Sequence, residues 1–293
     1  MLQNSSFEGR AIRYLLFDLG DTLWTKNTRN WKALEAAGNQ RASTLLAQFF
    51  PTPSSGPESG QKLREARGNA IMQALQAQNE ISPCTPDIMR TACQQIGYPL
   101  PTDEQTIALF EALRMRLPES RKLDDDALST LHTLKQRGYQ IGIVTNRQEG
   151  GRLFFEDLSK LGLLEAIHPD HVIVSCDYGL RKPHPAIFRA LLETMGASPA
   201  ETIMIGDNIY ADVVGAKRLK LQAIWKPPPE RLQAFQQQYP DRPLQLNELA
   251  DFVGRYEAKK YSLSSYNEIK PFMQPDAMIE RVSELLHLLP ETE

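Results

Sequence analysis

The chain has 293 residues, 41% of them hydrophobic, and a formal net charge of −3 at pH 7. This length predicts one large domain or two modest ones with a substantial core, and the scattered basic residues give no reason to expect a nucleic acid or an anionic membrane as partner. No apolar run reaches the ~20 residues needed to span a bilayer, the polar stretch 1–10 lacks the apolar centre of a signal peptide, and the three widely spaced cysteines outline no zinc site or disulfide framework, which favours a cytoplasmic protein.

The first predicted element is a short buried strand with the sequence "YLLF" at 14–17. An unbroken apolar run of this length is typical of a strand inside a sheet. Two carboxylates, Asp18 and Asp21, follow directly. We expect the strand and its turn to end at about Trp24.

Residues 25–121 change character and are predicted to be helical almost throughout. Their apolar residues repeat with helical spacing, and a loop rich in proline, serine and glycine at 51–60 separates the first two helices. Two later helices start at capping signals: Thr85 before a proline, and Thr102 with Gln105 three positions on. Little in this region favours a strand.

Beyond residue 124, short apolar strands alternate with helices, the pattern of a parallel sheet covered on both faces. The predicted strands lie at 140–146, 171–175, 202–207 and 222–225, and the predicted helices at 125–138, 151–162, 185–196 and 211–220. The strand at 14–17 is expected to belong to the same sheet, so the helical region is inserted just after it. The stretch 227–271 is polar and predicts one or two surface helices, and 276–289 predicts a closing helix.

Polar residues follow several of these strands. In a parallel sheet, ligands bind outside the carboxyl ends of the strands. The candidates at that edge are Asp18, Thr145, Asn146, Lys182, Asp207, Asn208 and Asp212. A hydroxyl, an ammonium and backbone N–H groups can hold a dianion, whereas carboxylates that face a phosphate repel it unless a cation neutralises them. Mg²⁺ suits such a set of oxygen ligands.

Four motifs carry a resemblance to a known family. They are "DLGDT" (18–22), "IVTN" (143–146), "RKPHP" (181–185) and "GDNIYAD" (206–212). Single motifs of this kind are weak signals, but together, in this order and at strand ends, they resemble the haloacid dehalogenase (HAD) superfamily of hydrolases, which are mostly Mg²⁺-dependent phosphatases. The cap of that family, placed directly after the first motif, matches the helical region.

The resemblance covers about 11–226 and returns at about 272–289, where "MQPDAMIERVSELLHLL" resembles the family's closing strand and helix. It implies an α/β fold, with a three-layer, Rossmann-like parallel sheet core and an all-helical cap domain. The implied domains are a core of 1–24 and 122–293, with 227–271 as a probable insertion, and a cap of 25–121.

The resemblance also implies a function, the Mg²⁺-dependent hydrolysis of a small-molecule phosphate ester through an aspartyl-phosphate intermediate. Asp18 would be the nucleophile that attacks phosphorus. Thr145 and Lys182 would hold the phosphoryl oxygens and stabilise charge in the transition state. Asn146 would be a supporting polar group near the phosphate.

The same resemblance implies a metal site. Asp18, the backbone carbonyl of Gly20 and Asp207 would bind Mg²⁺. Asp212 would orient the catalytic lysine or contact groups around the metal, with Asn208 as a further supporting residue.

The first motif departs from the family's pattern. Most phosphatases of the family carry a second Asp two positions after the nucleophile, which protonates the leaving alcohol and later activates water. Here that position is Gly20 and the second acid is Asp21, while Thr22 keeps its expected spacing. Acid–base help is worth ~10²–10⁴-fold, so aryl and acyl phosphates should suffer least from its loss. As a hypothesis, the glycine lets the turn rotate and brings the Asp21 carboxylate to the site.

Two alternatives to a phosphatase stay open. One is a dehalogenase of the same superfamily, in which Asp18 attacks carbon without a metal, although the retained Asp207 disfavours it. The other is a phosphate-binding or regulatory protein that has lost turnover through Gly20.

Specificity should reside in the cap, which offers no recognisable motif for a particular substrate. Its arginines, among them Arg29, Arg64 and Arg67, are interpreted as solvated helix charges rather than anion contacts. The expected partner is therefore a small phosphorylated substrate of undetermined identity, and the sequence does not determine the oligomeric state.

Overall fold

A computed structural model of the chain describes residues 7, 11–51, 56–260 and 266–291. Three predicted segments therefore lie partly outside the described residues. They are the polar stretch at 1–10, the loop at 51–60 and the insertion at 227–271. Within the described part of the chain, no helix is long and apolar enough to cross a membrane.

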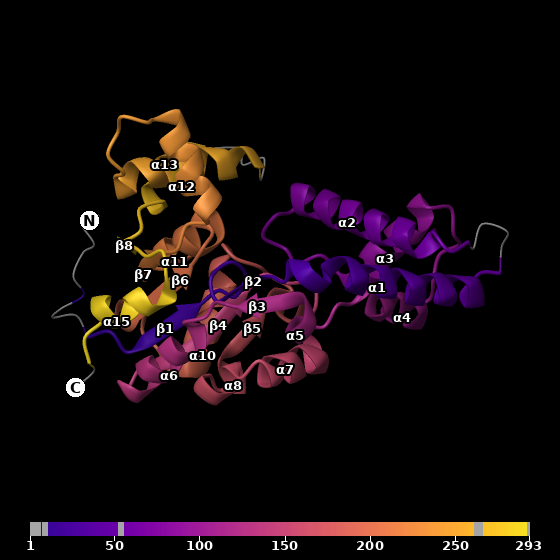
Figure 1. Cartoon of the computed structure of the whole chain (residues 1–293), viewed down its shortest axis with the longest axis horizontal. Coiled ribbons are helices and arrows are strands. Elements are labelled where there is room, and N and C mark those ends of the chain that lie inside the picture. Colours follow the sequence, from indigo (N-terminus) through magenta and orange to yellow (C-terminus); the bar gives the residue numbers. More distant parts are fainter. Residues whose placement is uncertain (1–6, 8–10, 52–55, 261–265, 292–293) are drawn as a thin grey trace.

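Six parallel strands form the central sheet, in the order β5–β4–β1–β6–β7–β8 (Figure 1). The strands are β1 Tyr14–Phe17, β4 Gln140–Thr145, β5 Val172–Val174, β6 Thr202–Gly206, β7 Gln222–Trp225 and β8 Ala277–Met278. Phe17, the last residue of β1, is level with Ile143 on one side and Ile205 on the other. The register therefore brings the carboxyl ends of β1, β4 and β6 together at one edge of the sheet, as the sequence predicts.

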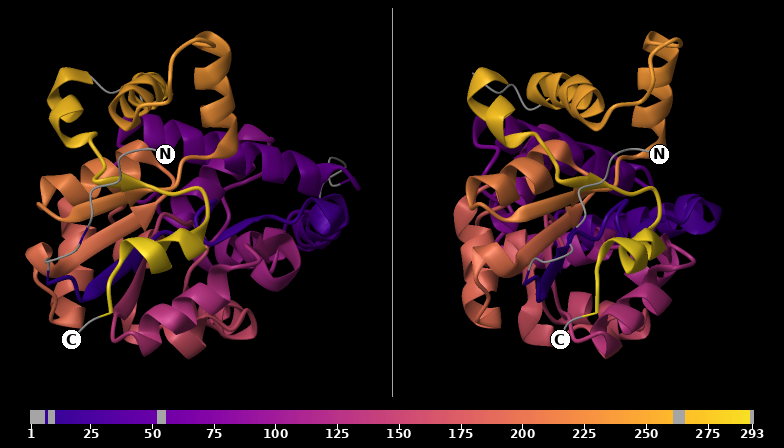
Figure 2. Two further views of the ribbon diagram at one scale, coloured as in Figure 1. Left: turned by 60° about the vertical axis from the view of Figure 1, so that its left-hand side comes forward. Right: turned by 90° about the vertical axis from the view of Figure 1, so that its left-hand side faces the viewer.

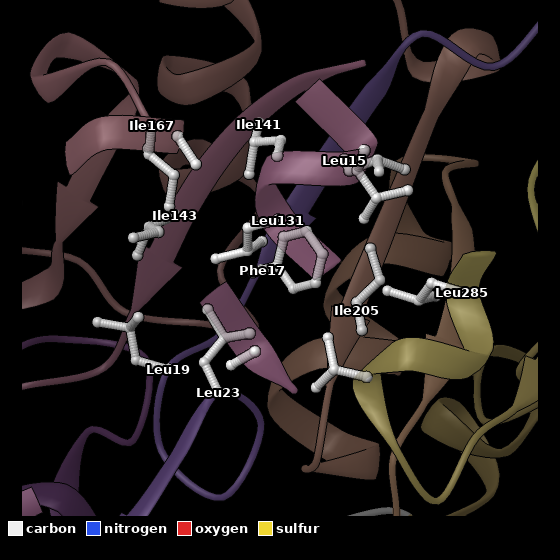
Figure 3. Packing of buried hydrophobic residues seen from close by; sticks show 14 of the residues in the cluster. Leu15, Phe17, Leu19, Leu23, Leu131, Ile141, Ile143, Ile167, Ile205 and Leu285 are labelled. Carbon is white, nitrogen blue, oxygen red and sulfur yellow. The ribbon is translucent and has the colours of Figure 1, made fainter. Parts of the chain in front are cut away.

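Side chains alternate between the two faces of the sheet, and helices cover both faces (Figure 2). On one face, Phe17 and Ile143 pack with Leu131 and Leu285 (Figure 3). The helical segments on this side are α6 Ala127–Gln136, α7 Gly151–Lys160, α8 Leu163–Ala166, η5 Val282–Glu284 and α15 Leu285–Leu288. The other face packs against α10 Pro185–Met195, η3 Ile209–Val214 and α11 Gly215–Arg218. Three further short helical segments are η1 Pro169–His171, α9 Ser175–Tyr178 and η2 Pro199–Glu201.

A helical insert leaves and rejoins the sheet through a two-stranded antiparallel ribbon, β2 Trp24–Lys26 and β3 Arg121–Leu123. The helices of the insert are α1 Thr28–Phe49, α2 Ser59–Ala77, α3 Thr85–Gln95, α4 Asp103–Leu113 and α5 Leu117–Ser120. The first four enclose a separate apolar core and lie beside the sheet in Figure 1. The ribbon was not predicted, and it spans both expected domain boundaries, so the division into core and cap stays a prediction.

The segment 227–271 contains the predicted helices, here α12 Pro229–Gln238, α13 Leu246–Lys260, α14 Tyr266–Ile269 and the short η4 Lys270–Phe272. They are more than surface helices, because Phe235, Leu249 and Val253 are fully or almost fully buried in the core on one face of the sheet. Helix α13 packs against η3, which follows β6. The segment therefore packs beside the "GDN" motif at 206–208, where β6 ends.

Three local predictions need correction. The closing helix predicted at 276–289 is wrong, because its first part pairs with β7 as strand β8 and only short turns, η5 and α15, follow. The N-cap of α3 is Cys84, not Thr85, whereas Thr102 and Gln105 form the predicted capping box. The helix predicted at 211–220 begins earlier, as a π-helix at Ile209.

Candidate active site

The candidate site lies where β1, β4 and β6 end. Asp18 follows β1 and its backbone N–H donates to the carbonyl of Ile205 at 2.9 Å, which continues the ladder of hydrogen bonds beyond the strand. Thr145 is the buried last residue of β4, and Asp207 follows β6. These three predicted site residues are therefore held by neighbouring strands rather than by mobile loops.

Lys182 is the centre of the charge arrangement. Its Nζ donates to Asp18 Oδ1 and to Asp212 Oδ1, at 2.6 Å in each case. Lys182 and Asp212 are almost completely buried. Burial opposes the charged ammonium, but the two carboxylates outweigh it and raise the pKa of Lys182. Lys182 is therefore a fixed cation next to Asp18, as the motif resemblance implies.

Asn146 holds the backbone of Lys182 in place. Its Nδ2 donates to the carbonyl of Lys182 at 3.0 Å, and its Oδ1 accepts from the N–H of Lys182 at 2.9 Å. Both ends of this amide thus contact protein. The expected contact between Asn146 and a phosphate stays a prediction, and the observed role is to position the lysine.

Asp18, Asp207 and Asp212 form an acidic group in which each residue offers an oxygen within 4.8 Å of the others. Burial, followed by the charges of Asp18 and Asp212, raises the pKa of Asp207 well above its ordinary value. Among the described residues, the Asp207 carboxylate has no hydrogen-bond or ion-pair partner, although its backbone carbonyl accepts from Trp225 Nε1 at 2.7 Å. A half-buried carboxylate that faces two other acids costs free energy that a divalent cation with oxygen ligands would recover, so the donor set fits Mg²⁺.

Asp212 differs from the other two acids because protein groups occupy both of its oxygens. Oδ1 accepts from Lys182, and Oδ2 accepts from the backbone N–H of Asn208 at 2.9 Å. A Cβ at Gly206 would lie only 2.2 Å from Asp212 Oδ2, so only a glycine leaves room for this carboxylate. The geometry fits the role of orienting Lys182.

Asn208 caps the π-helix that contains Asp212. Its Oδ1 accepts from the N–H groups of Tyr210 and Ala211, at 3.0 and 2.8 Å. Its Nδ2 donates to Glu257 Oε2 of α13 at 3.4 Å. The predicted supporting residue therefore also links the site to the C-terminal helices.

The turn after Asp18 has its left-handed residue at Asp21, with φ 54°, and not at Gly20, which has no positive φ. The Asp21 N–H donates to the carbonyl of Trp24 at 2.7 Å, and its own carbonyl accepts from Lys226 Nζ at 2.9 Å. The left-handed residue of the turn is thus Asp21 itself, and the hypothesis that Gly20 lets the turn rotate and brings the Asp21 carboxylate to the site stays a prediction.

The carboxylate of Asp21 does not belong to the acidic group, but it is electrically coupled to it. Burial, and then the charges of Glu230 and Asp18, raise its pKa. A raised pKa favours the protonated form, which is the state required of a proton donor. Whether Asp21 moves protons stays a prediction.

Three residues of the site were not found by sequence reasoning. Trp225 is the last residue of β7, and Arg147 lies two residues after the end of β4. Their positions at strand ends were a signal from which both could have been predicted. Glu257 carries no such signal, because only the packing of α13 on η3 brings it to Asn208.

A sequence model described as a haloacid dehalogenase-like hydrolase matches residues 12–220. A glyceraldehyde 3-phosphate phosphatase of Pyrococcus furiosus is 34% identical over 128 residues, which are 43% of this chain and 48% of that protein. A phosphoserine phosphatase of Thermus thermophilus is 29% identical over 238 residues, 73% of this chain and 88% of that protein. A glyceraldehyde 3-phosphate phosphatase of Methanopyrus kandleri is 32% identical over 207 residues, 71% of this chain and 80% of that protein. The alignments with the Pyrococcus relatives thus span about half of those proteins or less.

Solved structures show the same fold. A 2-haloacid dehalogenase from Pseudomonas syringae has a TM-score of 0.56 at 21% identity, covering 94% of this chain and 97% of that one. A HAD phosphatase from Thermococcus onnurineus has a TM-score of 0.54 at 22% identity, covering 96% of this chain and 99% of that one. At such identities the likeness concerns the fold and not the activity.

Proposed function

The chain belongs to the haloacid dehalogenase-like hydrolase family, and on this premise we propose that it is a Mg²⁺-dependent phosphatase of small phosphate esters. One observation carries the proposal. A buried lysine contacts the first-motif Asp18, while the carboxylate of the half-buried Asp207, a few ångströms away, has no partner among the described residues. Such a site is prepared both for an anionic phosphoryl group and for a cation.

Asp18 is the proposed nucleophile. Its Oδ1 accepts a hydrogen bond from Lys182 Nζ at 2.6 Å, so the attacking carboxylate and the lysine are held side by side. Attack would form a bond from the carboxylate oxygen to phosphorus and break the bond to the leaving oxygen, and water would later hydrolyse the aspartyl-phosphate. Lys182 and the Thr145 hydroxyl would stabilise the negative charge on the transferring group.

Mg²⁺, when bound by Asp18, the carbonyl of Gly20 and Asp207, would supply the positive charge that lets a phosphate approach these acids. Asp212 keeps Lys182 pointed at Asp18. Asp21 is the proposed source of the proton for the leaving oxygen, and its raised pKa supports this role.

The names of the relatives support the substrate class. They are phosphatases of glyceraldehyde 3-phosphate, phosphoserine and ribulose 1,5-bisphosphate, which are all small phosphorylated molecules. A cytoplasmic location is part of the same proposal and is supported by three free cysteines, Cys84, Cys93 and Cys176.

The test is hydrolysis of phenyl phosphate by the full chain, with Mg²⁺ and then with excess chelator, beside Asp18→Asn. We expect chelator-sensitive phosphate release that falls by at least ~10³-fold in this variant. Asp125→Asn, at an exposed acid near α6, is the matched control and should keep its activity. Metal-independent halide release from 2-chloropropionate would instead assign the dehalogenase reaction, and no turnover of a broad phosphate panel would favour a binding protein.

A further inference from the structure

Three arginine side chains gather beside the candidate site around a single carboxylate. Arg67 of α2 places Nη1 3.9 Å from Glu149 Oε1, and Arg147, two residues after the end of β4, places Nη2 3.2 Å from Glu149 Oε2. Arg121 of β3 is the third; its Nη1 donates to the carbonyl of Ser120 and its guanidinium lies over the ring of Trp31, and the charges of Arg147 and Glu149 act on it. This arginine cluster therefore joins the helical insert, the ribbon and the edge of the sheet.

The cluster is short of hydrogen-bond acceptors. The side chains of Arg67 and Arg147 are only 15% and 12% exposed. Within the part of the chain that the structure describes, buried N–H groups at Arg67 Nε and Nη1 and at Arg147 Nε have no hydrogen-bond partner. Buried donors without acceptors cost free energy. Arg67 and Arg147 share the one carboxylate of Glu149.

Structural arginines elsewhere in the insert look different. Arg64 donates to Asn39 Oδ1 and to the carbonyl of Leu113. Arg116 donates to Asp157 Oδ1 at 2.7 Å. These arginines find their acceptors within the protein.

In the arginine cluster, Arg147 Nη2 donates to Glu149 Oε2 and Arg121 Nη1 to the carbonyl of Ser120, but Arg67 Nε and Nη1 and Arg147 Nε have no acceptor among the described residues. Packing alone therefore explains Arg67 poorly, and Arg67 is not the solvated charge predicted from the sequence.

The arginine cluster faces the reacting groups. Arg147 lies over the ring of Trp24, 5.9 Å from its centroid, and Trp24 closes the turn that follows Asp18. Arg147 also directly follows Asn146, whose side-chain amide holds the backbone of Lys182. An anionic group held here would thus belong to the same molecule as a phosphate held at Lys182.

We infer that the arginine cluster binds a second anionic group of the substrate, a carboxylate or another phosphate carried by the leaving group. Guanidinium forks pair with both kinds of anion through two parallel hydrogen bonds. The inference rests on the proposed phosphatase function and narrows its substrate class to phosphomonoesters with two anionic ends. Because Arg67 comes from the insert and Arg147 from the sheet edge, the second anion would also contact both parts of the chain.

The experiment compares phenyl phosphate, 4-carboxyphenyl phosphate and hydroquinone bisphosphate as substrates of the full chain. These esters share an aryl leaving group and differ in the second anion, so they distinguish a carboxylate from a phosphate. We expect kcat/KM to be about 10- to 100-fold higher for at least one of the doubly anionic esters than for phenyl phosphate. Arg67→Met and Arg121→Gln should reduce that ratio, Arg67→Lys should restore part of it, and Lys62→Met, at an exposed position of the same helix, should leave it unchanged.

Equal kcat/KM for all three esters, or equal losses for all three in both arginine variants, would overturn the inference while leaving the phosphatase intact. A separate titration keeps the two ideas distinguishable. Asp18→Asn, which cannot form the covalent intermediate, is titrated calorimetrically with the same three esters. Tighter binding of a doubly anionic ester that Arg67→Met abolishes would support the arginine cluster even if the wild-type protein hydrolysed none of them, and equal binding of all three would refute it.

Discussion

Replacing Asp207 with asparagine should stabilise the metal-free protein. The substitution keeps the shape of the side chain and removes one negative charge from a buried group of three acids that faces one ammonium. Because the fold raises the pKa of Asp207, the protonated form is favoured in the folded state. The stability that this group contributes is therefore present at low pH and is lost as pH rises through the raised pKa, so at neutral pH the ionised side chain opposes folding.

The magnitude follows from the spacing of the acids. Two unit charges 4.8 Å apart repel by about 3.5 kcal/mol at an effective dielectric constant of about 20. Asp207 faces two such neighbours and the Lys182 ammonium, which offsets roughly one of them, and partial protonation reduces the remainder. We therefore expect Asp207→Asn to raise the free energy of unfolding by about 1–3 kcal/mol without metal. At about 2–4 °C per kcal/mol, the melting temperature should rise by roughly 2–12 °C.

The assay is thermal unfolding of both proteins at neutral pH, with chelator and with excess Mg²⁺. Mg²⁺ at 100 times its dissociation constant should stabilise the wild type by about 2.7 kcal/mol, and it should do little for Asp207→Asn. A variant that melts below the wild type in chelator, or that gains as much from Mg²⁺, would refute the electrostatic reasoning about this site.

Two further changes test the local geometry. Gly20→Asp introduces the acid that the family's pattern places at this position, and its Cβ would meet only Asp18 Oδ2, at 4.0 Å. If Asp21 is a weaker proton donor than an acid at position 20, kcat for alkyl phosphates should rise by about 10²-fold, more than for aryl phosphates, and an unchanged alkyl-to-aryl ratio would mean that Asp21 already donates the proton as effectively. Gly206→Ala forces a Cβ to within 2.2 Å of Asp212 Oδ2, so denaturant unfolding should show a loss of about 1–3 kcal/mol together with a large loss of kcat. Gly68→Ala, in open space on α2, should instead add about 0.5–1 kcal/mol, and similar behaviour of the two alanine variants would contradict the assigned packing around Asp212.

The sheet and most of its helices could be predicted because their signals are local. Buried parallel strands are apolar runs, and each here is bounded by helical periodicity. Because Asp18, Thr145 and Asp207 lie at or just after the ends of these strands, the sequence predicts that they share one edge of the sheet. What the strands share is a pattern that is complete within a few residues.

The missed elements depend on distant partners. The pattern of 276–289 predicts a helix, and only the family resemblance implies a closing strand there. Strand β8 has two residues, and it is a strand only because β7 offers it an edge to pair with. The ribbon of β2 and β3 joins segments on either side of the whole insert, such as Trp24 and Leu123. Three-residue strands carry too little periodicity to be recognised.

The sequence predicted which residues belong to the site better than it predicted the contacts between them. The side chain of Asn146 holds a backbone segment, which no motif reveals. The burial of Arg67 depends on how α2 meets the loop after β4, and an arginine on a helix is otherwise most simply a solvated charge. Asp21 adopts a left-handed backbone that its sequence permits but does not require.

The most direct test of the central claim is to trap the covalent intermediate. Without an acid at Gly20 to activate water, hydrolysis of the aspartyl-phosphate should be slower than its formation from an aryl phosphate. Wild-type protein mixed with excess phenyl phosphate and Mg²⁺, quenched in acid and mapped by mass spectrometry, should therefore carry a phosphoryl group on Asp18, and this signal should disappear with chelator or in Asp18→Asn. Steady turnover of phenyl phosphate with the phosphoryl group absent, or attached to another residue, would contradict the account.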